Sequence, residues 1–240
     1  MKASRQLTLD LGHRPALERE DFLVAPSNEL AVAWIDRWPD WPAQALAIYG
    51  PAGSGKTHLC QVWRRSSGAV AVNATILRAE EPPAILGEQN VCVVEGVAGV
   101  LADEPEVTRR LLHLYNMVLE RGGYLLFSDR TPPARWICPL ADLHSRLAGM
   151  QAVALGEPDE ALVQAVLVKL FADRQLTVSP EVIQFLTPRI ERSLDAARQV
   201  VASIDGRALE ARRDITIPLV REVLSQRPGG GNAMNGKEEV

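Results

Sequence analysis

An octapeptide in the first quarter of the chain limits the available folds more than any other feature of the sequence. Residues 50–57 read Gly-Pro-Ala-Gly-Ser-Gly-Lys-Thr and match the pattern G-x-x-x-x-G-K-[ST] at every fixed position. In this motif the glycines let backbone N–H groups turn inward around phosphates, the lysine reaches the β- and γ-phosphates, and the threonine hydroxyl is a ligand of Mg²⁺. Such a loop functions only between a buried strand and the start of a helix.

The residues on both sides of the loop have the required patterns. The apolar run 45–49 predicts a buried strand, and Leu59, Val62 and Trp63 share one face of the expected helix. The N-terminus of that helix adds positive potential where phosphates would lie. The alternative is a glycine-rich turn before an ordinary helix. We therefore expect ADP or ATP with Mg²⁺ to bind at Gly50, Pro51, Ala52, Gly53, Ser54, Gly55, Lys56, Thr57 and the adjacent His58.

The rest of the chain divides into a part that alternates strands with helices and a part that is only helical. Four further short apolar runs occur at 69–72, 91–94, 124–127 and 152–155. Helical stretches separate several of them, and Ser27 or Asn28 is the expected N-cap of the first helix. This alternation predicts an α/β fold in which helices sandwich a five-stranded parallel sheet. After Gly156, helical patterns follow one another without a strand. The expected domains are a flexible arm (1–20), a nucleotide-binding domain (21–155), a helical domain (156–226) and a disordered tail (227–240).

Composition excludes several classes of protein. With 47% hydrophobic and 23% charged residues, the chain is neither a disordered nor a collagen-like sequence. No apolar run approaches the ~18 residues that span a membrane, and no apolar segment follows the charged N-terminus as in an export signal, so we expect a cytoplasmic protein. Cys60, Cys92 and Cys138 lie among apolar neighbours and are expected to be core residues. The net charge of −4 argues against binding duplex DNA by charge alone.

A second candidate element for nucleotide chemistry is the strand 91–94 and the acid after it. Glu95 stands where a phosphate-loop protein places an Mg²⁺-side carboxylate, and Gly96 stands where a second acid would polarise the attacking water. Glycine can neither orient nor deprotonate water. The alternative for Glu95 is a surface carboxylate at a strand end. Thr57 and Glu95 are thus the expected metal-side residues, and we expect nucleotide binding with little hydrolysis by the isolated protein.

Five segments resemble the bacterial replication initiator DnaA in order and spacing. They are Asp21–Asn28, the loop 50–57, Leu125–Pro133, Asp142–Leu147 and Glu191–Asp195. The resemblance covers residues 20–226 and implies an AAA+ nucleotide-binding domain with a helical lid. Too few residues follow Arg192 for the helix-turn-helix domain that DnaA carries after its lid, so sequence-specific DNA binding is not expected.

The resemblance implies roles for several residues around the nucleotide. Phe22, Leu23 and Val24 would line the adenine pocket, partly through their backbone; the alternative is an apolar staple before the first helix. Ser128 and Asp129 would form sensor 1, at the end of the fourth strand; the alternative is a strand-to-turn cap.

Two arginines receive roles in the same way. Arg192 matches the sensor 2 arginine of the lid, which closes on the phosphates. Arg146 matches the arginine finger, which acts catalytically in trans on the ATP of a neighbouring subunit. Arginine suits both tasks because it stays charged and presents a planar fork of donors to phosphate oxygens. The alternative in each case is a surface arginine, since 22 of the 26 basic residues are arginines.

The first residues of the chain narrow the resemblance to the short, Hda-type relatives of DnaA. The segment 6–11 reads Gln-Leu-Thr-Leu-Asp-Leu and has the Q-L-x-L form of peptides that bind the sliding clamp, the β subunit of DNA polymerase. Gln6 would enter a polar subsite, and Leu7, Leu9 and Leu11 an apolar pocket. Asp10 departs from this pattern, because a smaller or prolyl residue is expected there. The alternative is an inert tail.

The resemblance implies a regulator that works with the DNA-loaded clamp to promote hydrolysis of ATP bound to DnaA. Its partners would be DnaA and the clamp, a homodimer is compatible with it, and the clamp would bring it to the nucleoid. A second hypothesis is a helicase loader or another adaptor that recruits a protein partner in a nucleotide-dependent way. A third is a protein that binds single-stranded DNA through its arginines, which the acidic balance of charge disfavours.

Overall fold

The computed structural model describes residues 22–226, which form two compact units. The first unit holds residues 22–51 and 55–156, and the second holds residues 52–54 and 157–226. The expectations for the arm, including Gln6, Leu7, Leu9 and Leu11, and for the tail concern residues outside the described range. Within that range no helix is long and apolar enough to cross a membrane.

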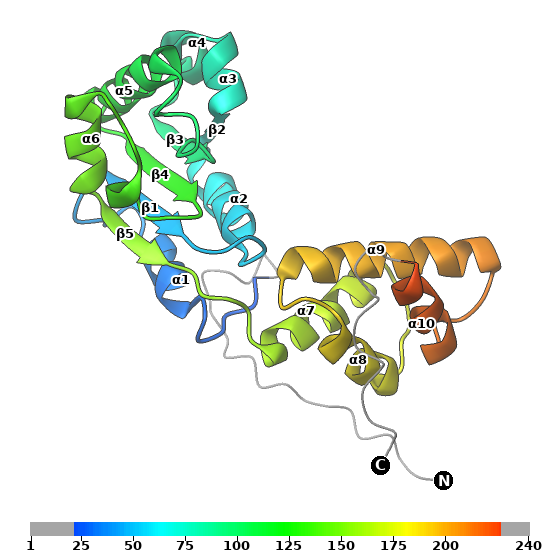
Figure 1. Cartoon of the computed structure of the whole chain (residues 1–240). Coiled ribbons are helices and arrows are strands. Elements are labelled where there is room, and N and C mark those ends of the chain that lie inside the picture. Colours follow the sequence, from blue (N-terminus) through cyan, green and yellow to red (C-terminus); the bar gives the residue numbers. More distant parts are fainter. Residues whose placement is uncertain (1–21, 227–240) are drawn as a thin grey trace, which may run out of the picture. The chain divides into compact units, whose positions relative to one another are not determined.

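A parallel sheet forms the centre of the first unit (Figure 1). Its strands are β1 (Ala45–Tyr49), β2 (Val70–Asn73), β3 (Val91–Glu95), β4 (Tyr124–Asp129) and β5 (Gln151–Ala154). Their order across the sheet is β2-β3-β4-β1-β5, and each neighbouring pair is parallel. The predicted five-stranded parallel sheet is confirmed, with strand ends that differ from the expected ones by at most two residues.

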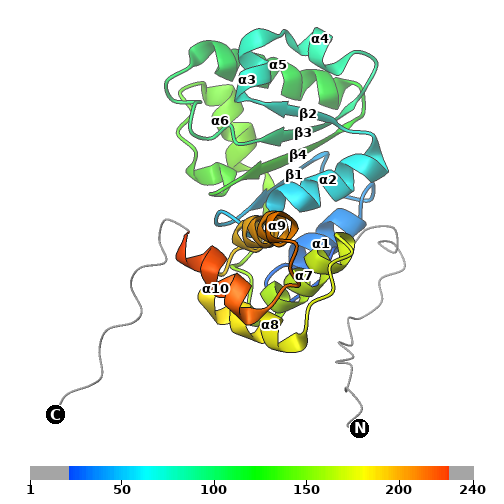
Figure 2. The same ribbon diagram turned by 90° about the vertical axis from the view of Figure 1, so that its right-hand side faces the viewer.

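Helices cover both faces of this sheet, as Figure 2 shows from a second direction. They are α1 (Glu29–Asp36), α2 (Lys56–Ser67), α3 (Ala74–Ala79), α4 (Pro82–Leu86), α5 (Pro105–Glu120) and α6 (Ala141–Ala148), with a short 3₁₀ turn at Pro133–Arg135. Strand alternation divides the core: Ala45 and Ala47 of β1 pack with α3 to α6, whereas Leu46 and Ile48 pack with α1 and α2. Both faces of the sheet are therefore buried, which explains the continuous apolar runs in the sequence.

The second unit is built from helices only, apart from the short segment 52–54. Its helices are α7 (Glu160–Asp173), α8 (Pro180–Leu186), α9 (Leu194–Ala211) and α10 (Ile217–Ser225), with a 3₁₀ turn at Thr187–Arg189. They share a core in which Leu167, Phe171, Val200, Ile204 and Val220 are fully buried. The predicted all-helical part of the fold is confirmed.

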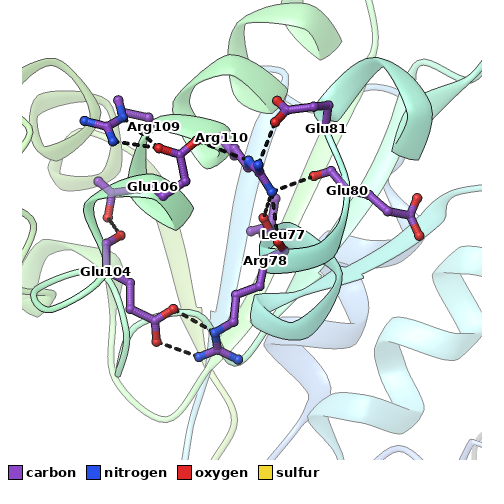
Figure 3. A network of polar contacts seen from close by, with 9 residues as sticks. Leu77, Arg78, Glu80, Glu81, Glu104, Glu106, Arg109 and Arg110 are labelled. Carbon is purple, nitrogen blue, oxygen red and sulfur yellow. Dashed lines mark hydrogen bonds and ion pairs between the residues drawn. The ribbon is translucent and has the colours of Figure 1, made fainter.

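One partly buried arginine joins three helices of the first unit (Figure 3). The Nη1 atom of Arg110 in α5 donates to the carbonyls of Leu77 (2.9 Å) and Arg78 (3.0 Å), which belong to the last turn of α3. Its Nη2 atom lies 2.6 Å from a carboxylate oxygen of Glu81, the N-cap residue of α4. Positive charge at a helix C-terminus satisfies carbonyls that have no partner within the helix. Arg110 therefore fixes the end of α3 and the start of α4 on α5.

This arrangement predicts different costs for two adjacent arginines. The Arg110 side chain is 18% exposed, whereas Arg109 is 65% exposed and, within residues 22–226, pairs only with Glu106, on its own helix. We expect Arg110→Met to lower the free energy of unfolding of the first unit by about 2–3 kcal/mol, since two helix-end carbonyls and a carboxylate lose a charged donor. Arg109→Met should change it by less than about 0.5 kcal/mol.

Urea unfolding followed by tryptophan fluorescence measures this difference. All five tryptophans of the chain lie in the first unit, so the signal reports on that unit alone. Equal shifts of the unfolding midpoint in the two variants would contradict the role assigned to Arg110.

Candidate functional site

Four elements that matter for nucleotide binding meet at the carboxyl edge of the sheet. Strand β1 ends at Tyr49, whose register partner on β4 is Asp129, and Glu95 at the end of β3 is the partner of Ser128. The loop begins immediately after β1, and the Gly50 N–H donates to the Asp129 carbonyl (3.2 Å). In open parallel sheets, ligands bind beyond the carboxyl ends of the strands. The sheet therefore brings together residues that are about 45 and 80 positions apart in the sequence.

The loop itself has the backbone expected of a phosphate cradle. Gly55, the N-cap of α2, has a φ of 99°, a conformation that side chains other than glycine rarely adopt. The Nζ atom of Lys56 donates to the carbonyls of Gly50 (2.8 Å) and Pro51 (2.6 Å). The ammonium group thus lies against the first residues of the loop. The N–H groups at the N-terminus of α2 are also available to phosphates bound by this loop.

A second glycine of the loop is required by packing. Gly53, grouped with the second unit, has a φ of +69°, and a Cβ atom there would lie 1.9 Å from the Ser193 hydroxyl oxygen. Its carbonyl accepts the N–H of Leu194, the first residue of α9 (2.8 Å). The neighbouring Arg192 is exposed. Only glycine fits at position 53 in this arrangement.

Thr57 and Glu95 meet across the gap between α2 and β3. The Thr57 hydroxyl bonds to the Glu95 carboxylate, while partial burial raises the pKa of that carboxyl above its ordinary value. This hydrogen bond and the nearby charge of Arg64 oppose the increase in pKa. A hydroxyl and a carboxylate oxygen are hard donors of the kind that Mg²⁺ accepts beside phosphates and water. The described residues hold no cluster of three His, Cys, Asp or Glu side chains that could bind a metal on its own. The pair therefore fits an ion that is held jointly with a nucleotide.

The position after Glu95 differs from an ordinary strand residue in its backbone as well as its side chain. Gly96 has a φ of +66°, and its N–H donates to the Ser128 carbonyl (2.9 Å). The chain turns away from the strand direction here, in a conformation that disfavours most other residues. An acidic side chain at this position would be strained, although nothing within 4 Å would block its Cβ atom.

Ser128 and Asp129 lie at the end of β4 but have different surroundings. Ser128 is 4% exposed and bonds to the thiol of Cys60 in α2; burial raises the pKa of that thiol. Both carboxylate oxygens of Asp129 accept backbone N–H groups, from Ala98 (2.9 Å) and Arg130 (2.7 Å). Asp129 thus has the strand-to-turn contacts of the alternative interpretation, while Ser128 lies between the edge of the sheet and α2.

The segment before α1 is fixed to both helices on its side of the sheet. The Phe22 ring stacks on His58 of α2, with 5.2 Å between ring centroids. Asn28 is the N-cap residue of α1, but its side chain makes no cap bond and turns back to Leu23 and Ala25. The capping pattern predicted the position of Asn28 but missed this contact, because a sequence does not distinguish an asparagine that caps forward from one that bonds backward.

Arg146 belongs to the first unit and contacts its own chain. It lies in the last turn of α6, with Nε 3.0 Å from Asp142 Oδ1 and its guanidinium 5.5 Å from the ring centroid of Tyr115. Its side chain is 36% exposed, so the guanidinium remains accessible. Tyr115, a buried residue of α5, was not predicted as part of this site.

Comparisons with known proteins agree with this architecture. A family model described as "Hda, lid domain" matches residues 159–224. DnaA of Thermomicrobium roseum is 26% identical over 264 residues, which cover 99% of this chain and 56% of the relative. Domain III of Thermotoga maritima DnaA matches with a TM-score of 0.76 at 17% identity, over 88% of this chain and 97% of that one. AMPPCP-bound DnaA from Aquifex aeolicus matches with a TM-score of 0.66 at 18% identity, over 82% and 67% of the two chains.

The matches cover only part of some of the related proteins. The chain spans about half the length of the DnaA relatives it matches, at 56% and 47% of their residues. The structural matches support the α/β fold with its phosphate loop, and the lid match concerns the helices of the second unit. Together with the motifs at the edge of the sheet, they support a DnaA-related AAA+ fold whose helical unit is similar to the lid domain of Hda.

Proposed function

We propose that this protein is a nucleotide-binding AAA+ regulator that, with the DNA-loaded sliding clamp, stimulates hydrolysis of ATP on the initiator DnaA and so represses repeated initiation of replication. The observation that carries the proposal is a complete phosphate loop beside an acidic strand end that lacks its second acid. Lys56, Thr57 and Glu95 supply what binding requires, and Gly96 lacks what hydrolysis requires.

ADP is the proposed working nucleotide. ADP would keep the contacts to Lys56 and to the loop N–H groups. It lacks only the γ-phosphate, which is the group that hydrolysis removes. The AMPPCP-bound DnaA of Aquifex aeolicus has a comparable fold, which supports nucleotide binding by this protein. Thr57 and Glu95 are the residues that would hold Mg²⁺, whose charge offsets that of the phosphates.

Around the nucleotide, Phe22, Leu23 and Val24 are proposed to contact the adenine, and Ser128 and Asp129 to act as sensor 1. Arg192 is proposed as sensor 2 of the lid. The stacking of Phe22 on His58 and the burial of Ser128 beside α2 support the first two assignments.

The activity in trans is assigned to Arg146. Its guanidinium is accessible and lies on the first unit, at a position that matches the arginine finger of DnaA. A finger of this kind stabilises charge that develops on a γ-phosphate held by another subunit. The partner that offers this phosphate is proposed to be DnaA, to which this chain is related.

A reconstituted reaction tests the proposal directly. Purified DnaA loaded with labelled ATP is mixed with clamp on nicked circular DNA, with and without this protein, and ADP formation is measured. We expect faster hydrolysis only when DNA, clamp and this protein are all present. Equal rates with and without the protein would contradict the regulatory function and favour an adaptor that recruits another partner, such as a replicative helicase.

Clamp binding by the segment 6–11 is a separate prediction. Replacing both Gln6 and Leu9 with alanine removes an amide donor and a leucine anchor, each worth ~1–3 kcal/mol when buried. We expect clamp affinity to fall by one to a few powers of ten. Surface-bound clamp, with the unsubstituted and the doubly substituted protein in solution, provides the measurement. Replacement of Thr8 with alanine is the control, because Thr8 is not an expected anchor; equal affinity of all three proteins would remove the support for clamp recruitment.

A further inference from the structure

A buried asparagine holds the segment that is proposed to contact the adenine. Asn28 is 2% exposed, and its side chain forms hydrogen bonds with the backbone of both Leu23 and Ala25. Its Nδ2 atom donates to the Leu23 carbonyl (3.0 Å), and its Oδ1 atom accepts the N–H of Ala25 (2.9 Å). A buried amide with both ends bonded is costly to replace, because the two backbone groups would lose their partners.

These two bonds fix the peptide groups on either side of Val24. The Leu23 carbonyl shares one planar peptide group with the Val24 N–H, and the Val24 carbonyl shares the next with the Ala25 N–H. In a trans peptide the carbonyl and the N–H point in opposite directions. Because Asn28 binds the Leu23 carbonyl and the Ala25 N–H, the N–H and carbonyl of Val24 both point away from it.

The segment has little freedom to relax around these bonds. The Asn28 N–H donates to the Ala25 carbonyl (2.9 Å), which closes the turn before α1. At the other end, Phe22 stacks on His58, the third residue of α2. Val24 therefore presents one donor and one acceptor in fixed directions from a segment anchored to two helices.

This pair of groups distinguishes purine bases. Adenine carries an amino donor at N6 beside ring-nitrogen acceptors, whereas guanine carries the acceptor O6 in the same place. A fixed carbonyl accepts a hydrogen bond from the amino group of adenine. It repels O6 of guanine, because both oxygens are acceptors. We propose that Asn28 is the positioning residue that gives this protein its preference for adenine nucleotides, acting through the two peptide groups that flank Val24. The inference rests on the proposed nucleotide-binding function and adds its base specificity.

Two substitutions and a matched control test the proposal. Asn28→Asp keeps the acceptor for Ala25 but puts an oxygen against the Leu23 carbonyl, and Asn28→Ala removes both bonds. Asn73→Ala is the control, because Asn73 is also a helix N-cap residue but bonds forward, to the Ile76 N–H of its own helix (3.0 Å). Equilibrium dialysis with ADP and with GDP gives the base preference, and competition by tripolyphosphate gives the affinity for a ligand without a base.

In both Asn28 variants we expect ADP affinity to fall about tenfold relative to the unsubstituted protein. The ratio of ADP affinity to GDP affinity should also fall, whereas the affinity for tripolyphosphate should not change. The Asn73→Ala protein should keep all three values. If ADP and tripolyphosphate weaken by the same factor, or if the base preference of Asn28→Asp equals that of the unsubstituted protein, Asn28 does not position the base contact and the inference is wrong. Absence of ADP binding by the unsubstituted protein would instead contradict the proposed function itself.

Discussion

Replacing Arg146 with alanine should reduce the stimulated hydrolysis of DnaA-bound ATP by about a thousandfold or more, to the unstimulated rate. Arginine fingers supply ~10³–10⁵ in rate in other phosphoryl-transfer systems, because the guanidinium stabilises charge that develops in the transition state. The measurement is labelled ADP formed on DnaA in the presence of clamp and DNA. ADP binding, thermal stability and clamp binding by the variant should be unchanged.

The surroundings of Arg146 make the substitution informative. The guanidinium contacts Asp142, one turn earlier in α6, which is exposed, and the ring of Tyr115, which is buried. An exposed pair four residues apart contributes only ~0.3–0.5 kcal/mol to stability, so a large loss of activity cannot come from unfolding. Arg146→Lys should recover little, since a point charge does not reproduce the planar fork.

Arg135→Ala is the matched control for this experiment. Arg135 is an exposed arginine in the 3₁₀ turn before α6, and no motif of the initiator matches it. Its loss should leave stimulation nearly unchanged. Stimulation at the unsubstituted rate by Arg146→Ala would show that the stimulating group lies elsewhere among the arginines of the chain.

The fold could be predicted largely because its strands are buried on both faces. A strand such as Ala45–Tyr49 that contacts helices on both sides contains only apolar residues, and this leaves a clear signal in the sequence. The short helices α3 and α4 leave a weaker signal, because six and five residues hardly complete a hydrophobic period. Their positions depend on Arg110, whose contacts with Leu77 and Glu81 join residues about 30 positions apart.

The site could be predicted where its chemistry follows from residue type and spacing. The phosphate loop and Glu95 belong to this class, and the structure brings Thr57 and Glu95 into contact. The backward bonds of Asn28 and the positive φ of Gly96 depend on backbone directions that the sequence does not specify. Asn28 has the residue type of an ordinary helix cap, and Gly96 indicates a missing acid without indicating that the chain turns there.

Replacing Lys56 with alanine should weaken ADP binding by about 10- to 100-fold. A hydrogen bond from a charged donor contributes ~1.5–3 kcal/mol, and each 1.4 kcal/mol is a factor of ten in affinity. In the described structure the ammonium group is bonded to the Gly50 and Pro51 carbonyls. A bound phosphate would be a stronger acceptor than these carbonyls, because it carries charge.

The chain offers a matched control for this substitution, since Lys169 is the other lysine among the described residues. Lys169 bonds to Asp173 within α7 (2.6 Å), and a pair of this kind contributes little, so Lys169→Ala should bind ADP with unchanged affinity. Equilibrium dialysis of ADP against the three proteins measures the difference.

The same proteins test the expectation of slow hydrolysis. Rapid ATP turnover by the unsubstituted protein, lost in Lys56→Ala, would mean that another acid replaces the one missing at Gly96. Glu104 is a poor candidate because Arg78 already binds both of its carboxylate oxygens. Unchanged ADP affinity in Lys56→Ala would place the nucleotide away from the loop and contradict the proposed site.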